Sequence, residues 1–408
     1  MLVYSTPGPR IEGRLRASFG DFQVRELMAL ELSQERSAGL VPVYEVEKRG
    51  IDTPHVAREI AAAIKSEVNF AGLKDKNASV VQYVSARSSR AAAPPAIKGD
   101  RFEARLLGFS RPINREMLSG NRFRIVVETA AEADARIAEV LEAARGRRVA
   151  NFFGYQRFGL KGGTNRLVGK KIVQRDFGGA VGLMLAQPRE GEEGEASEAR
   201  RIAGEGRYAD AAKLFTGGQD TERRMAYHLS EKPDDFLGAI RRIQIPIRRL
   251  LVNSYQSYLF NLTLSRIVSE GLEIAQVSRG DNWAPLREGG LAIGRVHGVR
   301  EEAPAGTGAV PLVQIVGYAH RDYGSRFDAV LAEVLREEGV SPSSFYVKEA
   351  EEMSSEGGFR AAPLLATDLR REKAERGYSI EFSLGKGEYA TILLRELLKP
   401  EDPLEAGF

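Results

Sequence analysis

The segment that decides how the two ends of the chain fold together is residues 378–397, "YSIEFSLGKGEYATILLREL". Tyr378, Ile380, Phe382 and Leu384 alternate with other residues, which predicts a strand with one buried face. "GKGEY" then predicts a turn, and "ATILLRELLK" predicts a helix. This strand and helix need a partner sheet, and the opening part of the chain offers one.

The opening residues also predict strands followed by a helix. "RLRASFGDFQVREL" and "VPVYEVEKRG" alternate apolar and polar side chains, so that Phe22 and Val24 share one strand face. A helix is expected next, with Thr53 as its N-cap and Pro54 at its first position.

Two further strands and a second helix complete this unit. "SVVQYVSA" (79–86) and "GNRFRIVVE" (120–128) predict the strands, with Phe123 on an apolar face. "AAEADARIAEVLEAARG" predicts a helix over 130–146 that stops at Gly146. The opening and closing parts are therefore expected to form one α+β unit, with helices on one side of the strands.

The middle of the chain has a different amino-acid composition. It begins with "NFFGYQRFGLKGGTNRLVGK", which is rich in glycine, aromatic and basic residues. An acidic tract near 189–200 predicts a mobile loop or a solvated helix face, and 250–268 predicts a long helix. We expect residues 1–150 and 357–408 to form the first unit, with residues 151–356 inserted as a second unit.

Composition excludes several classes of site. The 408 residues carry a net charge of only +3, so an RNA partner would require basic residues gathered on one face. The absence of Cys excludes disulfides, thiolate catalysis and Cys-based zinc sites, and the four His residues lack metal-ligand spacing. No phosphate loop occurs, so neither a metal nor a nucleotide cofactor is expected.

The chain also lacks the signals of membrane proteins and secreted proteins. No uncharged apolar run reaches about 18 residues, and the first residues lack the basic and apolar segments of a secretory signal. We therefore expect no membrane contact and a cytoplasmic location. Nothing in the sequence predicts an oligomeric state.

One carboxylate, Asp75 in "FAGLKDKNASVVQ", lies between Lys74 and Lys76. Charged residues in turns usually only keep the turn solvated. Neighbouring cations also lower the pKa of a carboxyl group, which would make Asp75 a nucleophile or base that is ionised at neutral pH. Both interpretations stay open on these residues alone.

The segment "NFFGYQRFG" (151–159) interleaves aromatic side chains with Gln156 and Arg157. Such a mixture suits unstacked RNA bases, because bases stack on aromatic rings and arginine binds phosphates. The alternative is a buried core segment with an arginine at its edge, which the usual burial of aromatic residues favours.

Five motifs in order, "FAGLKDKNASVVQ", "GNRFRI", "NFFGYQRFG", "NSYQSYLFN" and "GEYATILLREL", extend over nearly the whole chain. Together they resemble the TruD-type tRNA pseudouridine synthases. "GRLRASFGDFQVRE" and "EKRGIDTPHVAREIA" are similar to the opening of that family. The resemblance implies an α+β pseudouridine synthase core with a mixed or antiparallel sheet, an inserted domain peculiar to the family, and RNA in the cleft between them.

The activity implied by the resemblance is isomerisation of a D-arm uridine of tRNA, uridine-13, to pseudouridine, without metal or cofactor. The N-glycosidic bond breaks, the uracil rotates, and a C5–C1′ bond forms. The essential aspartate of the family matches Asp75. Whether it attacks ribose C1′ or removes a C2′ proton stays open, and both roles need an ionised carboxylate.

The resemblance also implies substrate-binding residues. The basic partner of the aspartate matches Arg16, where lysine is more usual; arginine forms an ion pair but cannot shuttle a proton at neutral pH. The aromatic that stacks on the target base matches Phe123, and Phe22 and Asn121 match other substrate-lining residues. The remaining expected contacts are Lys74, Asn151, Phe152, Gln156 and Arg157.

Two other functions remain as alternatives. A noncatalytic RNA-binding or RNA-folding protein could share the fold, but it would have no use for Asp75, whose charge repels phosphates. A glycoside hydrolase would need paired carboxylates flanking a bond, and the motifs contain no second candidate. One departure from the family is Phe152, where a tyrosine is expected, so any hydrogen bond from that hydroxyl is lost.

Overall fold

The computed structural model describes residues 2–15, 18–74, 76–130, 133–159, 163–189, 191–304, 308–404, 406 and 408. Asp75 and Arg16, the expected catalytic residue and its basic partner, lie outside the described residues. Among the described helices, none combines the length and apolarity needed to cross a membrane.

The first unit is built on a ten-stranded sheet. Its elements are β1 (Gly13–Leu15), η1 (Phe19–Asp21), β2 (Phe22–Met28), β3 (Val41–Arg49), α1 (Thr53–Ile64), β4 (Val68–Phe70), β5 (Ser79–Ala86), β6 (Ala96–Gly99), β7 (Phe102–Ser110), η2 (Arg115–Met117), β8 (Leu118–Thr129), α2 (Asp134–Arg145), β12 (Ala366–Ala374), β13 (Gly377–Gly385) and α11 (Ala390–Leu398).

The strand order of this sheet is β12-β13-β8-β2-β5-β3-β7-β6, with β1 also paired to β8 and β4 to β5. All described pairs are antiparallel except β2 with β5, so the sheet is mixed, as expected for the α+β core. β13 pairs with β8 and sets Phe382 opposite Phe123. This pairing confirms that the strand predicted at 378–384 joins the sheet of the opening residues.

The first helix starts where the sequence predicts, but with a different cap. The N-cap of α1 is Asp52, whose Oδ1 accepts a hydrogen bond from the backbone N–H of His55 at 2.9 Å. The prediction of Thr53 as the cap was wrong, because its buried hydroxyl donates to Gln82 Oε1 at 2.9 Å. The same hydroxyl accepts from the N–H of Lys74 at 3.1 Å, so Thr53 supports the turn that leads to Asp75.

The segment from residue 151 to residue 361 is mostly helical. Its elements are η4 (Tyr155–Phe158), α3 (Thr164–Val173), α4 (Phe177–Leu185), α5 (Glu195–Gly204), α6 (Tyr208–Leu214), α7 (Asp220–Glu231), α8 (Phe236–Ile240), α9 (Ile245–Ser269), β9 (Trp283–Ala284), β10 (Val310–Ile315), α10 (Arg326–Glu338), η5 (Pro342–Phe345), η6 (Lys348–Met353) and β11 (Gly358–Ala361). The acidic tract near 189–200 runs into α5, where Glu198 is exposed but Arg200 is buried and paired with Glu192 and Glu222.

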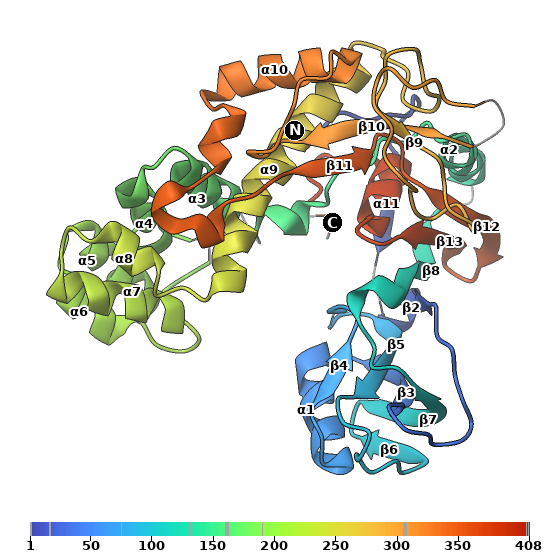
Figure 1. Ribbon diagram of the computed structural model, residues 1–408, viewed down its shortest axis with the longest axis horizontal. Coiled ribbons are helices and arrows are strands. Elements are labelled where there is room, and N and C mark those ends of the chain that lie inside the picture. Colours follow the sequence, from blue (N-terminus) through green and yellow to red (C-terminus); the bar gives the residue numbers. More distant parts are fainter. Residues whose placement is uncertain are drawn as a thin grey trace.

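Figure 1 shows these elements arranged as an arch. Helices α3–α8, here called the helical lobe, form one end, and α1 with β3–β7 forms the other. The long helix α9 joins the helical lobe to the middle of the arch, because Leu251 and Leu259 belong to the core of the lobe while Phe260 and Leu264 belong to the core of the large sheet.

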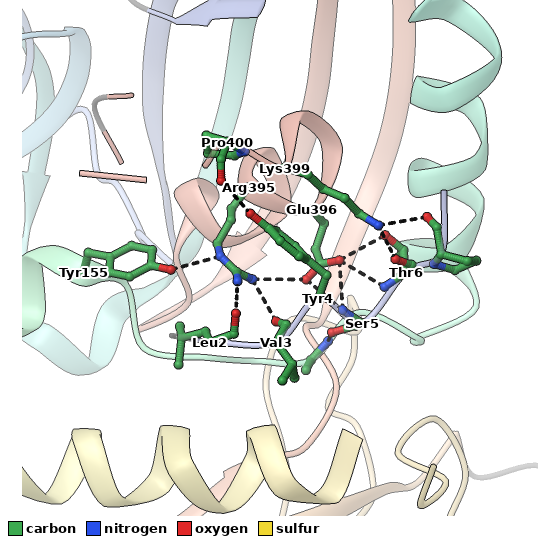
Figure 2. Close-up of polar contacts among 12 residues, drawn as sticks. Leu2, Val3, Tyr4, Ser5, Thr6, Tyr155, Arg395, Glu396, Lys399 and Pro400 are labelled. Atoms are coloured by element: carbon green, nitrogen blue, oxygen red, sulfur yellow. Dashed lines mark hydrogen bonds and ion pairs between the residues drawn. The ribbon is translucent and has the colours of Figure 1, made fainter. Parts of the chain in front are cut away.

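A cluster of polar contacts, drawn in Figure 2 and here called the terminal cluster, holds the first residues of the chain against α11. Arg395 and Glu396 are both fully buried. Arg395 donates to the carbonyls of Leu2 and Val3 and, at 3.0 Å, to the hydroxyl of Tyr155. The cluster thereby holds together three parts of the chain that are far apart in sequence, namely residues 2–6, Tyr155 and residues 395–399.

The division of the chain into units remains a proposal. We propose that residues 1–150 and the C-terminal part form one folding unit around the large sheet. β11 pairs with β10 in a separate three-stranded sheet with β9, so its residues pack with the inserted segment. This pairing favours a second junction after Ala361 rather than at 356.

Candidate functional site

A cavity of about 230 Å³ opens between β2, β8, η4 and the start of α11, and we call it the sheet cavity. Five of the residues expected to bind substrate line it, namely Phe22, Lys74, Asn121, Phe123 and Gln156. The other lining residues are Val24, Leu73, Glu388, Tyr389, Ala390 and Thr391. Segments from both ends and the middle of the chain therefore build one site.

The aromatic wall of the sheet cavity is formed by Phe22 and Phe123, and Phe382 packs behind Phe123. The ring of Phe123 lies edge-to-face against Phe22, with centroids 6.3 Å apart, and stacked against Phe382 at 5.3 Å. Phe123 is 8% exposed, so the ring is fixed by packing and presents only a small surface to the cavity. A ring held in this way suits stacking on a flat ligand, because it loses little conformational freedom on binding.

Another part of the lining is polar and is organised by Lys74. Its Nζ donates to Asn121 Oδ1 at 2.8 Å and forms an ion pair with Glu26 Oε1 at 3.0 Å. Glu26 and Asn121 face each other across β2 and β8, so one ammonium group contacts both. Glu26 is only 2% exposed, and its charge balances that of Lys74. Lys74 therefore orients Asn121 rather than standing as a free cation.

A second lysine lies beneath the same turn. Lys48 is 1% exposed, and its Nζ donates to the carbonyls of Ile51 at 2.8 Å and Lys74 at 3.4 Å. The carbonyl carbon of Lys74 is bonded to the nitrogen of Asp75, so a buried cation is fixed beside the peptide that leads into Asp75. Sequence reasoning missed Lys48, because nothing local indicates that β3 passes under this turn.

The "NFFG" segment supports the site from inside the core. Phe152 is fully buried and Asn151 is 2% exposed. The prediction that these two side chains contact a substrate is therefore corrected, because neither is accessible. Asn151 donates to Glu388 Oε1 at 3.1 Å and to the carbonyl of Ala361 at 3.2 Å. The core interpretation therefore holds for the start of the segment.

The "NSYQSYLFN" motif explains how this segment is held. Asn261, 1% exposed on α9, accepts from the N–H of Phe153 at 2.8 Å and donates to its carbonyl at 2.9 Å. Gly154 has no room for a side chain, because a Cβ there would lie 2.7 Å from the ring of Tyr389. These contacts set the position of η4, which follows directly.

The last two predicted residues lie on η4 and have different surroundings. Gln156 is exposed and lines the sheet cavity. Arg157 is half-buried, does not line this cavity, and donates from Nε to Ser257 Oγ at 3.3 Å. The structure thus brings Gln156 to Phe22, Lys74, Asn121 and Phe123, and leaves Arg157 beside them.

Glu388 is a cavity residue that sequence reasoning read only as part of a turn. Its carboxylate accepts hydrogen bonds from Asn151 and from the N–H groups of Leu365 and Gly385, the last two at 3.0 Å each. Burial raises the pKa of Glu388 to about 7, although these donors and Arg360 oppose the shift. The signal that could have found Glu388 was a carboxylate in a strand-to-helix turn at the end of a sheet strand.

The dimensions and lining limit what the sheet cavity can bind. Cavities for drug-sized ligands are roughly 300–1,000 Å³, so this one suits a group about the size of a single base. The described residues contain no group of three or more His, Cys, Asp or Glu side chains able to hold a metal ion. One aromatic wall and one polar wall fit a planar ligand whose edge carries hydrogen-bonding groups.

Comparison with known proteins identifies the family. The family model described as tRNA pseudouridine synthase D (TruD) matches residues 1–397. The chain belongs to the tRNA pseudouridine synthase D family. A Methanosarcina barkeri protein named as a member is 31% identical, over 99% of this chain and 97% of its own length. A Methanopyrus kandleri protein of the same name is 34% identical, over 88% and 86%.

A solved structure agrees with this assignment. The structure described as tRNA pseudouridine synthase D (TruD) from Methanosarcina mazei has a TM-score of 0.82 and 29% sequence identity to this chain, and covers 99% of this chain and 97% of its own. The family resemblance and the α+β fold expected from the motifs are confirmed.

Proposed function

We propose that this chain isomerises a uridine of tRNA to pseudouridine, that the target is uridine-13 in the D-arm, and that Asp75 is the essential carboxylate. Membership of the tRNA pseudouridine synthase D family supports the reaction class. The observation that carries the proposal is the sheet cavity, which is lined both by Phe123 and by Lys74, the residue before Asp75.

The cavity suits a uridine that has left the RNA stack. Flipping costs roughly a few kcal/mol, and stacking on an aromatic ring returns ~1–3 kcal/mol. Uracil would lie against Phe123, and the amide of Asn121, oriented by Lys74, would face its polar edge. The ribose would then be close to Lys74, the residue before Asp75.

The reaction needs an ionised carboxylate beside the ribose. Asp75 would either attack C1′ or remove a proton from C2′, and in both cases the C1′–N1 bond breaks. The freed uracil rotates, C5 bonds to C1′, the proton on C5 leaves, and N1 gains one, so no oxidant or reductant is consumed. The buried Lys48 donates to the carbonyl of Lys74 at 3.4 Å, which brings a cation near the residue that precedes Asp75.

The test is Asp75→Asn, measured by tritium release from tRNA labelled at uridine C5 and by a gel shift on the same RNA. We expect release to fall by at least ~10²–10⁴-fold, the usual contribution of a positioned acid or base, while binding is retained. Asp100→Asn, the same change on an exposed turn, should leave both unchanged. Release at the wild-type rate by Asp75→Asn would remove Asp75 from the mechanism, and binding without release by the unmutated protein would favour an RNA-binding function.

A further inference from the structure

The helical lobe has a cavity of its own, of about 680 Å³, formed by α6, α7 and the residues after α8. Part of its lining is apolar, from Ala209 and Ala212, and Tyr227 stands 60% exposed at its side. We call it the lobe cavity. An exposed tyrosine beside an apolar hollow gives a flat ligand a ring on which to stack.

The charges around the lobe cavity are mostly positive. Lys213, Arg223, Arg224 and Arg242 line it, against one carboxylate, Glu231. Arg224 has no ion pair or hydrogen bond from its side chain to any other described residue. Arg223 is paired with Asp220 at 2.6 Å and Lys213 with Asp210 at 3.4 Å, both on the exposed surface, where solvent weakens such pairs.

Arg242 is fixed in the wall without losing its charge. Its Nη2 and Nε lie 3.0 Å and 3.2 Å from Nδ1 of His228, which is 4% exposed. A guanidinium can only donate, so Nδ1 accepts, and the proton of the neutral imidazole is on Nε2, which donates to Asp235 Oδ2 at 2.9 Å. A Cβ on Gly238 would lie 2.4 Å from that Nε2, so the packing depends on glycine there.

The lobe cavity is too far from the sheet cavity for one nucleotide to reach both. Arg242 comes just before α9, and Ser257, twelve residues into that helix, contacts Arg157 beside the sheet cavity. At 1.5 Å per residue, this part of α9 alone is about 18 Å long. A ligand common to both cavities must be an extended chain.

We infer that the lobe cavity binds a second part of the RNA substrate, with an unpaired base stacked on Tyr227 and phosphates held by Arg224 and Arg242. The choice of RNA follows from charge complementarity and from the pairing of an exposed ring with uncompensated guanidinium groups. The inference rests on the proposed function only in taking the RNA to be tRNA.

The experiment compares the full-length protein with its Tyr227→Ala and Arg224→Gln variants, both changed at exposed side chains. Binding of an unmodified tRNA transcript is measured without turnover at several salt concentrations. We expect Tyr227→Ala to weaken binding by about 5- to 150-fold, from the usual contribution of a base stacked on an aromatic ring. Arg224→Gln should reduce the slope of log Kd against log salt by about one phosphate contact.

Two controls separate this inference from the proposed activity. Arg336→Gln, an exposed arginine on α10 along the outer side of the arch, should bind tRNA as the wild type does. A short D-arm hairpin should bind equally well to all variants, because it cannot reach the lobe cavity. Weaker tRNA binding by Tyr227→Ala and Arg224→Gln supports the inference even if no pseudouridine forms, and unchanged affinity and salt slope in both variants would overturn it.

Discussion

Two buried charged pairs differ in their surroundings. The side chains of Arg395 and Glu396 are hydrogen-bonded to partners within the protein, whereas the pair of Lys74 and Glu26 borders an open cavity. In the terminal cluster, Glu396 accepts from Ser5 and Thr6 at 3.0–3.1 Å, and Arg395 uses all three nitrogens of its guanidinium. Beside the sheet cavity, the ion pair with Lys74 is the single contact of Glu26 Oε1 among the described residues. Gln82 Nε2 likewise has no hydrogen-bond partner in the part of the chain that the structure describes.

The difference separates groups that stabilise the fold from groups that are available to a ligand. A buried charge with every hydrogen bond formed holds its segments in one arrangement, and removing one partner is costly. Polar groups left partly unsatisfied at a cavity lower stability, and such exceptions concentrate at functional sites. The three predictions below test this separation.

The largest effect on stability is expected in the terminal cluster. Glu396→Gln keeps the shape of the side chain but leaves the buried Arg395 without its carboxylate. We expect the free energy of unfolding to fall by about 3–5 kcal/mol, the usual cost of breaking a buried pair. Urea unfolding measures this loss, and kcat/KM per folded molecule should stay near the wild-type value.

A matched variant tests whether burial is the cause. Glu401→Gln makes the same change in an exposed pair with Arg10, at 2.7 Å, and should leave the unfolding midpoint unchanged. Equal losses from Glu396→Gln and Glu401→Gln would contradict the special role of the saturated cluster.

The second prediction concerns the ring of Phe123. Phe123→Leu keeps an apolar side chain in the sheet cavity but removes the surface on which a base can stack. We expect kcat/KM for tRNA to fall by about 5- to 150-fold, equivalent to ~1–3 kcal/mol. Phe382→Leu removes the buried ring behind Phe123, which does not line the cavity, and should lower stability more than activity. Wild-type kcat/KM in Phe123→Leu would show that the ring serves only packing.

The third prediction is a dependence of stability on pH at Glu388. The pKa of its carboxyl group is about 7 in the folded chain and 4.5 in the unfolded reference. Between these values the folded protein holds the proton and the unfolded chain has lost it. The stability that Glu388 contributes is therefore complete below about pH 4.5 and is lost as the pH rises through about 7.

Comparison with Glu388→Gln isolates this group from the other titrating side chains. The free energy of unfolding of the wild type, relative to Glu388→Gln, should fall between about pH 4.5 and about pH 7. A difference that rises with pH would mean that the N–H donors from Leu365 and Gly385 outweigh burial, and a constant difference would mean that Glu388 does not titrate in this range.

Much of the sheet could be predicted because its strands carry their pattern locally. β5 has the predicted bounds, and β13 and β8 contain the strands expected at 378–384 and 120–128. The cap of α1 was missed because a tertiary contact, from Thr53 to Gln82, takes the hydroxyl that a local rule assigns to the helix end. The short helices of the helical lobe carry too little pattern of their own, since much of their stability comes from packing.

The lining of the sheet cavity was predicted only where its residues lie within motifs. Phe22, Asn121 and Phe123 were expected to lie together, but Glu388 and Tyr389 enter the cavity from the turn after β13, which no local pattern shows. Lys48 was missed for the same reason, and Phe152 was misplaced because a motif names residues without showing which way they face.

The pairing of β13 with β8 has a consequence for how the protein is made. Arg376 and Glu128 form an ion pair at 3.3 Å although they are 248 residues apart in the chain. A ribosome adding about 5–20 residues per second needs roughly 12–50 s to make that stretch. Throughout this interval the β8 edge that will accept β13 is without its partner, and an open strand edge is a template for wrong pairing. We therefore expect the nascent chain to depend on chaperones, or on early folding of the helical lobe, until the last strand of the sheet emerges.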